Sequence, residues 1–146
     1  MNNKFTILGC GSSLGSPWIT NYRGYLNKSA KNTRTRCCAH ILYKDISVLI
    51  DTSPDIKNQF LKNKINSLDA IVYTHQHADQ VSGIFEMRPF FWKNKKKIPI
   101  YGSQRTIKAL KKTYTYCFSK RHGYKPIMTA KVVKNLFSIK KNNNKL

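Results

Sequence analysis

The amino-acid sequence predicts a single α/β domain in which short buried strands alternate with amphipathic helices. Three observations support this prediction. The chain has 146 residues, enough for one domain with a core. Hydrophobic residues make up 40% of it and aromatic residues 12%, which excludes a wholly disordered chain. Its apolar runs and helix-start signals follow the order β-β-β-α-β-α-β-α-β, which is typical of a layered α/β domain.

The first third of the chain predicts three strands and one long loop. Residues 5–10 (FTILGC) have the pattern of a short buried strand, ended by a Gly-Ser-Ser stop signal. Residues 14–36 are mostly polar, and a loop of this length inside a domain is usually functional or disordered. Residues 40–43 and 48–50 are expected to pair as a hairpin around residues 44–47.

Two helices are predicted from their capping signals. In the first, Ser53 is the expected N-cap, Pro54 suits the first helical position and Asp55 favours the positive end of the helix dipole. This helix should end near residue 62 and bury one face. Ser103 is the expected N-cap of the second helix. The residues expected to be buried are Ile56, Phe60, Leu61, Ile107, Leu110 and Tyr114.

Local patterns predict the remaining elements. A buried strand at residues 70–73 precedes a short helical turn at residues 81–87, and a further strand follows at residues 98–101. One or two more strands are expected within residues 124–139. The predicted domain therefore spans residues 1–139, and the Lys- and Asn-rich tail, residues 140–146, is predicted to be disordered.

The charge of the chain is strongly one-sided. There are 27 Lys and Arg residues against 6 Asp and Glu, which gives a formal net charge of +21. One interpretation is attraction to nucleic acid or phosphorylated substrates. We favour the other, compositional bias, because Lys far outnumbers Arg, Asn and Ile are abundant, and the cations spread along the chain. In either case a positive surface would steer anionic substrates toward the protein.

Cysteine spacing and hydropathy indicate a reduced cytoplasmic protein. The four cysteines show no CxxC spacing, and Cys37 and Cys38 are adjacent, which suits neither a zinc knuckle nor a small disulfide scaffold. The first apolar run meets Gly9 too soon to be a secretory signal. No segment approaches the ~18 apolar residues of a membrane span, so no membrane partner is expected.

The motif that carries chemistry is THQHADQ at residues 74–80, directly after a predicted strand. α/β folds tend to place ligand sites at such strand ends. His75 and His77 are two residues apart in an extended segment, so both imidazoles can point to one side, and Asp79 adds an oxygen in the same direction. Neutral imidazole suits zinc and other transition metals, so the motif predicts a partial metal shell. The alternative is a loop that holds two histidines by chance, and the preceding strand argues against it.

The sequence resembles the metallo-β-lactamase superfamily, and within it the branch of the phosphonate-pathway cyclic phosphodiesterase. The resemblance covers most of residues 4–130 and consists of blocks in the family's order. The blocks are LGCGSSLGSP at 8–17, TRTR at 33–36, LIDTSPD at 49–55, LDAIVYTHQHAD at 68–79, SGI at 82–84, MR at 87–88 and IPIYG at 98–102.

The resemblance implies an αββα sandwich with a two-metal site, filled by zinc or manganese, that hydrolyses a phosphodiester. It assigns His75 and His77 to the first metal. It assigns Asp79 to the second metal and to catalysis, and Asp51 to a buried carboxylate that steadies the site loops. Ser12 and Ser13, in the loop after the first strand, would lie near the substrate phosphate.

The sequence departs from the family pattern in two ways. Gln80 replaces a histidine ligand of the second metal, and its weaker amide oxygen predicts a loss of roughly ten- to a thousand-fold in metal affinity or activity. The family's second half, which supplies another histidine to each metal and a bridging aspartate, has no counterpart. We therefore expect a truncated N-terminal half of the sandwich. Glu86 and His122 are later candidate ligands, and His122 is interpreted as an exposed residue of a cationic turn.

Three functions stay open at this stage. The first is a metal-dependent hydrolase of anionic phosphoesters, inactive alone and active once a separately encoded C-terminal half completes it. The second is a degenerate gene remnant without activity. The third is a non-catalytic basic protein that binds polyanions, with nucleic acid a partner that we do not favour.

Two further features are interpreted as structural. Residues 90–92 (FFW) stand beside a lysine run at residues 93–97, a mixture that single-strand binders also use. A packed aromatic edge next to a solvated lysine loop accounts for it. Loss of the second sheet would also leave an apolar face uncovered and open to a partner.

Overall fold

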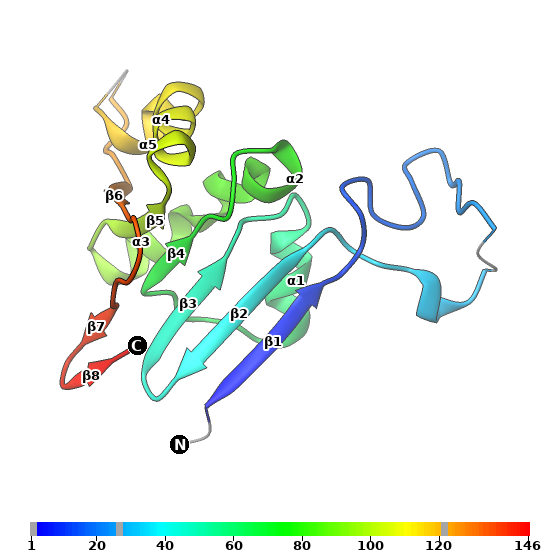
Figure 1. The fold of residues 1–146 in the computed structure, drawn as a ribbon, viewed down its shortest axis with the longest axis horizontal. Helices are drawn as coiled ribbons and strands as arrows, with labels where there is room; N and C mark the ends of the chain where they lie inside the picture. Colours follow the sequence, from blue (N-terminus) through cyan, green and yellow to red (C-terminus); the bar gives the residue numbers. More distant parts are fainter. Residues whose placement is uncertain (1–2, 26–27, 121–122) are drawn as a thin grey trace.

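The computed structural model describes residues 3–25, 28–120 and 123–146. Six strands form one sheet in the order β1-β2-β3-β4-β5-β6 (Figure 1). They are β1 Lys4–Gly9, β2 Cys38–Tyr43, β3 Ile46–Ile50, β4 Ala70–Val72, β5 Ile98–Gly102 and β6 Met128–Val132. The first three pair antiparallel, and the pairs from β3 to β6 are parallel. The predicted α/β class and the hairpin between residues 40 and 50 are confirmed.

Helices connect the parallel strands, because a parallel pair needs a crossover connection. α1 joins β3 to β4, a run of three helical segments joins β4 to β5, and α4 and α5 join β5 to β6. The helical elements are α1 Ile56–Asn63, α2 Ala78–Val81, η2 Ser82–Met87, α3 Arg88–Asn94, α4 Gln104–Thr113 and α5 Thr115–Phe118. A short 3-10 turn, η1 Ala30–Asn32, lies in the long loop after β1.

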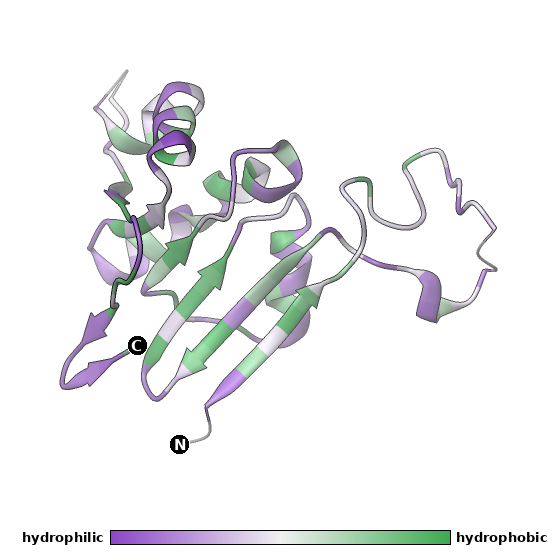
Figure 2. Ribbon diagram, viewed as in Figure 1, coloured by the Kyte–Doolittle hydropathy of each residue, from purple (hydrophilic) through white to green (hydrophobic). Residues whose placement is uncertain are grey.

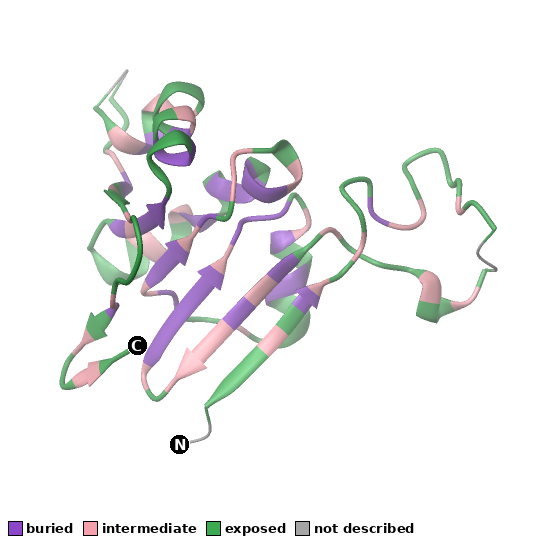
Figure 3. Ribbon diagram, viewed as in Figure 1, coloured by how far each residue is buried: buried purple, intermediate pink, exposed green. Residues whose placement is uncertain are grey.

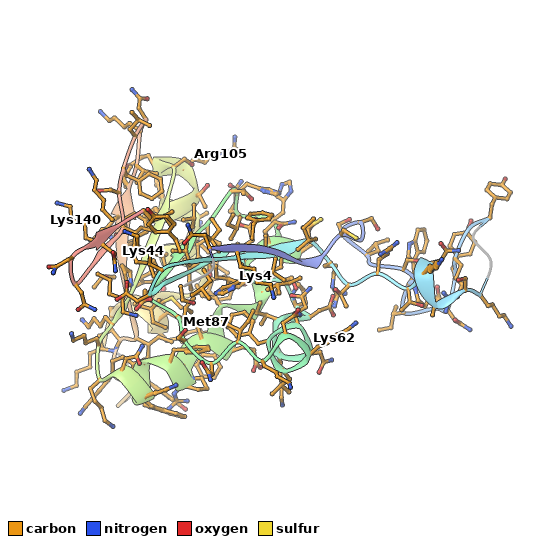
Figure 4. All side chains as sticks on the ribbon, turned by 90° about the horizontal axis from the view of Figure 1, so that it is seen from below. Lys4, Lys44, Lys62, Met87, Arg105 and Lys140 are labelled. Atoms are coloured by element: carbon orange, nitrogen blue, oxygen red, sulfur yellow. The ribbon has the colours of Figure 1, made fainter. Side chains whose placement is uncertain are left out.

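The main core lies between the sheet and the helices. Alternate strand residues point to this side, and apolar helix faces cover them. In Figure 4, α1 and α3 lie on one side of the β1–β3 strands, with Met87 in the layer between. Hydropathy is highest along the central strands (Figure 2), where β3 is buried over almost its whole length (Figure 3). Strand and helix contributors include Leu49, Ile71, Ile100, Met128, Ile56, Ile84, Met87, Ile107 and Leu110.

The opposite face of the sheet is covered only in part. Ile46, Val48 and Ala70 pack there against the chain that returns after β6, in which Ile139 is buried. Toward β1 this cover ends, and Phe5 and Ile7 are 61% and 66% exposed. The sheet therefore has one helix-covered face and one partly open apolar face.

The first predicted strand needs a correction. Residues 5–10 were expected to form a buried strand, but β1 is an edge strand in which only Leu8 is buried. Its other large apolar side chains, Phe5 and Ile7, point to the partly open face. A short apolar run cannot by itself distinguish a strand covered on both faces from one covered on a single face.

The first helix also begins later than predicted. α1 has Asp55 rather than Ser53 as its N-cap. Ser53 instead accepts a hydrogen bond from the Asp55 backbone and donates one to Gln59. Leu61, expected in the core, is 69% exposed, and Gln59 is buried in its place. The cause is a long-range contact, because the Gln59 amide donates to the Arg36 carbonyl at 2.9 Å.

The C-terminal tail forms a hairpin rather than the predicted disordered segment. β7 Lys140–Lys141 pairs antiparallel with β8 Asn144–Lys145. Asp45 anchors the hairpin by accepting hydrogen bonds from Asn142 at 2.8 Å and Asn144 at 2.7 Å. The composition of the tail could not predict this hairpin, because its partner Asp45 lies almost a hundred positions away along the chain.

The long loop between β1 and β2 extends away from the sheet (Figure 1). Its two ends are held together by isolated bridges between Gly11 and Arg36 and between Ser16 and Arg34. Within the described part of the chain, no helix is long and apolar enough to span a bilayer.

Candidate metal centre

The predicted motif leaves the carboxyl end of β4, as the sequence indicated. The Tyr73 amide still donates to the Tyr101 carbonyl of β5, so the segment keeps the direction of the strand. His77 then adopts an extended conformation as the N-cap of α2, and Asp79 follows in the first turn of that helix. An extended chain thus supplies the two imidazoles, and a helix start supplies the carboxylate.

The structure brings the three predicted ligands together. One ligand atom each from His75, His77 and Asp79 lies within 4.8 Å of the others. The two imidazole rings are 4.7 Å apart between centroids and nearly perpendicular. His77 is exposed, and the other two residues are half-buried, so the cluster opens to solvent. Among the described residues it is the only group of three or more His, Cys, Asp or Glu side chains gathered in this way.

Asp51 holds the segment that carries the ligands in place through Thr74. It is buried, and its carboxylate accepts hydrogen bonds from the Thr74 amide at 2.9 Å and the Thr74 hydroxyl at 2.7 Å. The backbone of Asp51 has a φ of 62°, in the left-handed region that non-glycine residues rarely adopt. Burial raises the pKa of Asp51, while the two hydrogen bonds from Thr74 oppose that rise.

The Thr74 hydroxyl also determines the tautomer of His75. It lies 3.0 Å from His75 Nδ1. A hydroxyl has one proton, and here that proton goes to Asp51, so the oxygen accepts from Nδ1–H. The lone pair of His75 is therefore on Nε2, the nitrogen left for a cation. Spacing alone did not single out Thr74, although it lies inside the motif.

Gln80 contacts the candidate ligand beside it. The residue is 7% exposed, and its amide Nε2 donates to Asp79 Oδ2 at 2.8 Å. One carboxylate oxygen of Asp79 is thus engaged, and the other is left for an ion. The Gln80 carbonyl accepts from the Thr52 amide at 2.7 Å, which joins α2 to the segment after β3.

The residues beneath the cluster form a buried polar layer that sequence reasoning missed. The Thr52 and Tyr73 hydroxyls are 2.9 Å apart, and both residues are buried. Burial raises the pKa of Tyr73 well above its ordinary value, so this phenol stays neutral. The sequence offers only a weak indication of this layer, namely that Thr52 and Tyr73 are polar residues just after the ends of strands.

The other predicted site residues lie apart from the cluster or beyond description. Ser12 and Ser13 are both exposed in the long loop, and the Ser12 hydroxyl donates to the Gly15 carbonyl at 3.4 Å. In the described ranges, no hydrogen bond joins either serine to the three ligands. Glu86 is exposed in η2 and is not a member of the cluster. His122 lies outside the described residues.

The donor set suits one divalent transition ion. Two imidazole nitrogens and one carboxylate oxygen match the preference of zinc, and three protein ligands leave coordination positions open, as catalytic sites require. The relay from Asp51 through Thr74 to His75 adds the kind of outer hydrogen bond that metal-binding histidines use. The residues present therefore fit a single ion.

Comparison with known proteins identifies the family. A family model described as a β-lactamase superfamily domain matches residues 47–141. The chain belongs to the metallo-β-lactamase superfamily. The structure of a diphosphatase from the PhnP family superposes with a TM-score of 0.81 at 30% sequence identity, covering 99% of this chain and 55% of that one. The predicted superfamily and its PhnP-related branch are thus confirmed.

More distant matches agree on the fold. Zinc-bound PqqB from Methylobacterium extorquens superposes with a TM-score of 0.62 at 14% identity, covering 94% of this chain and 48% of that one. A Porphyromonas gingivalis protein named octanoyltransferase is 32% identical over 116 residues, which are 78% of this chain and 23% of that protein. The chain thus spans about half the length of the solved structures it resembles. Family membership implies a metal cofactor, and His75, His77 and Asp79 are the described residues able to hold it.

Proposed function

We propose that this chain contributes a metal-binding centre to the hydrolysis of a phosphoester or diphosphate anion. The observation that carries the proposal is the gathering of His75, His77 and Asp79 ligand atoms within 4.8 Å at the end of β4. Similarity to a PhnP-family diphosphatase at 30% identity supports phosphoryl chemistry. The net charge of +21 adds attraction for an anionic substrate.

Zinc or manganese is the proposed ion. Imidazole favours zinc, and a carboxylate also accepts manganese. His75 through Nε2, His77 and Asp79 would hold the ion, which would act as a Lewis acid toward a phosphoryl oxygen of the substrate. The superfamily resemblance implies two ions. In this chain Gln80 stands where the resemblance expects a histidine ligand of the second ion, and its amide donates to Asp79 instead. We therefore propose that one ion dominates in this chain.

The chain's own residues orient and expose the centre. Asp51 and Thr74 fix His75 in the tautomer that leaves Nε2 free. Asp79, the proposed catalytic carboxylate, keeps one oxygen for an ion while Gln80 holds the other. His77 borders the solvent from which an anion would approach. A phosphate contact from Ser12 or Ser13 stays a proposal, since the loop that carries them extends away from the sheet.

We further propose that a separately encoded C-terminal half completes the centre. This chain aligns with 55% of the diphosphatase, and the partly open sheet face leaves Phe5 and Ile7 more than half exposed. A second layer over that face would bury both side chains. Because the described residues supply three protein ligands, we expect the chain alone to hydrolyse phosphodiesters weakly or not at all.

The cytoplasm is the proposed location. All four cysteines are free, and burial raises the pKa of Cys38 and Cys117 to about 12, which keeps both thiols protonated and unreactive. Because no disulfide supports the fold, a reducing compartment costs the protein no stability.

Metal titration tests the centre. Calorimetric titration of the metal-free chain with Zn²⁺ or Mn²⁺ should give one ion per chain. His77→Ala and Asp79→Asn should each weaken binding by at least about tenfold, since even outer-shell changes cost ~10–100-fold. Glu86→Gln removes an exposed carboxylate outside the cluster and should leave the affinity unchanged. Binding that survives both cluster variants would contradict the proposal.

A complementation assay tests the proposed partner separately. Hydrolysis of bis(p-nitrophenyl) phosphate should be weak with this chain alone. Co-expression with a polypeptide that corresponds to the unmatched part of the diphosphatase should raise it, in a chelator-sensitive manner. Equal turnover with and without that polypeptide would overturn the partner proposal and leave the metal centre standing.

A further inference from the structure

A cavity lies between α3 and the segment that leads into β6. Its volume is about 710 Å³, and it is lined by Arg88, Phe91, Trp92, Lys95, Tyr124 and Lys125 among others. None of its lining residues belongs to the metal cluster. The volume lies within the range of ordinary small-molecule sites. The cavity is therefore large enough for a ligand of its own.

Aromatic rings and a guanidinium meet at this cavity. The Arg88 guanidinium carbon lies 4.4 Å from the Trp92 ring centroid and 5.3 Å from that of Tyr124. Trp92 and Tyr124 are each 50% exposed, so part of each ring is available to a ligand. Phe90, by contrast, packs against Phe60 at 5.7 Å. The expected packed aromatic edge thus holds for Phe90 but not for Trp92.

Among the described residues, the cations at the cavity have no acidic partner. Arg88, Lys95 and Lys125 line it, and its lining includes no aspartate or glutamate. The ion pairs found among the described residues, Arg36–Asp55 and Lys141–Asp69, lie elsewhere. Half-buried Arg88 is a planar donor with a fork suited to phosphate. The site therefore favours a ligand that carries negative charge.

We propose that this cavity binds a nucleoside phosphate. The base lies against the exposed part of Trp92, which Arg88 does not cover, and the phosphate is held by Arg88, Lys95 and Lys125. Base stacking on an aromatic ring contributes about 1–3 kcal/mol in single-strand binding proteins, and arginine adds cation–π contacts. An acidic peptide would pair with the cations but would not need the aromatic rings. A free mononucleotide and one nucleotide of a single strand share the required chemistry.

Tryptophan fluorescence offers a direct readout. The chain has two tryptophans, Trp18 and Trp92, so Trp18→Phe leaves Trp92 as the only tryptophan reporter. Titration with adenosine monophosphate at low salt should quench its emission to saturation, and ribose 5-phosphate should bind at least several-fold more weakly. Equal binding of the two ligands would overturn the proposal, because the base would then contribute nothing.

Variants distinguish nucleotide binding at the cavity from non-specific attraction of an anion to a basic protein. By calorimetry, Trp92→Leu should weaken nucleotide binding at least about tenfold, Trp92→Tyr should retain most of it, and Lys125→Gln should weaken it several-fold. The matched control is Lys57→Gln, an exposed lysine of α1 outside the cavity, which should change nothing. If the two lysine variants behave alike, or Trp92→Leu binds as tightly as the unmodified chain, the assignment fails.

An oligonucleotide distinguishes the two sources of the ligand. A single strand on the order of ten nucleotides long that binds much more tightly than the mononucleotide, and in a way that Trp92→Leu abolishes, identifies single-stranded nucleic acid. Similar affinities identify a free nucleotide. Binding of polyglutamate that matches the oligonucleotide and ignores Trp92→Leu would replace the proposal with simple charge attraction.

Discussion

The Thr74 hydroxyl links a buried acid to a candidate metal ligand. It donates to Asp51 and accepts from His75 Nδ1, so one short side chain sets both the position of the loop and the tautomer of the ligand. Asp51 is held in a left-handed conformation with a φ of 62°, and its carboxylate also accepts from the Thr74 amide. The backbone and side chain of Thr74 therefore attach the ligand segment to the end of β3 at two points.

Thr74→Val removes this link while keeping the shape of the side chain. We expect the affinity for Zn²⁺ to fall about tenfold or more, because outer-shell partners of metal-binding histidines have effects of ~10–100-fold. Thr74→Ser keeps the hydroxyl and should restore most of the affinity. The measurement is calorimetric titration with Zn²⁺. If valine and serine variants bind equally well, the hydroxyl does not orient His75.

His40 predicts a pH dependence of stability away from the metal centre. It is buried, its Nε2 lies 2.8 Å from the Ser47 hydroxyl, and burial, together with nearby Lys4, lowers its pKa. The unfolded chain therefore takes up this proton more readily. Stability from this group is unaffected above pH 6.5 and falls as the pH drops below that value. The slope is at most about 1.4 kcal/mol per pH unit.

Urea unfolding measured between neutral and mildly acidic pH checks this sign. The unmodified chain should lose more stability over that range than His40→Gln, which cannot take up the proton but can still bond to Ser47. The difference between the two proteins isolates His40 from the other three histidines and the carboxylates. A difference that grows toward alkaline pH would contradict the assignment.

The ligand residues were more predictable from sequence than their supports. His75 and His77 are two positions apart in an extended segment that continues a strand, which brings their imidazoles together. Asp79 joins them from the first turn of α2. The contact between Thr74 and Asp51 joins residues 23 positions apart, and the direction of the Gln80 amide depends on Asp79 as its neighbour in space. No local pattern encodes these hydrogen bonds.

At the scale of elements, the site depends on close packing of η2 against the segment that follows β3. Gly83 lies at this junction, and its amide donates to the Thr52 carbonyl at 2.9 Å. A Cβ built on Gly83 would lie 2.3 Å from the Ser53 carbonyl oxygen and 2.7 Å from Ile56 Cγ2. The close approach of the two backbones thus requires a residue without a side chain.

Gly83→Ala should therefore destabilise the fold although alanine favours helix. Overpacking of this kind costs about 1–3 kcal/mol, and the loss should appear as a lower urea midpoint with an unchanged slope. Ser82→Ala changes an exposed neighbour in the same 3-10 helix and should have little effect. Equal midpoints for the two variants would mean that the backbones separate at no cost.

Element boundaries show where local signals lose to tertiary contacts. The strands and helices themselves follow from apolar periodicity, and Ser103 caps α4 as predicted, accepting from the Thr106 amide. Ser53 loses the corresponding role in α1, where Arg36 donates to Asp55 through its backbone and its guanidinium. A partner brought in by the long loop decides that helix start, and a window of sequence around Ser53 does not contain it.

At the scale of the whole molecule, charge repulsion opposes folding. There are 27 cationic residues against 6 acidic ones, and only two ion pairs occur among the described residues. Folding brings these cations closer together, so the compact state carries a repulsive cost that the expanded chain partly avoids. The partly open sheet face lowers stability separately, because apolar side chains such as Phe5 remain in water there.

Salt should therefore stabilise the protein by screening. The Debye length falls from about 30 Å at 0.01 M to about 3 Å at 1 M ionic strength, and we expect Tm to rise on the order of a few degrees over that range. Sodium chloride and choline chloride at equal ionic strength should act alike if screening dominates. Inorganic phosphate at the same ionic strength should exceed both, because its exclusion from the protein surface adds to the screening. A Tm that stays flat or falls with added chloride would show that the net charge of +21 imposes no measurable cost on the fold.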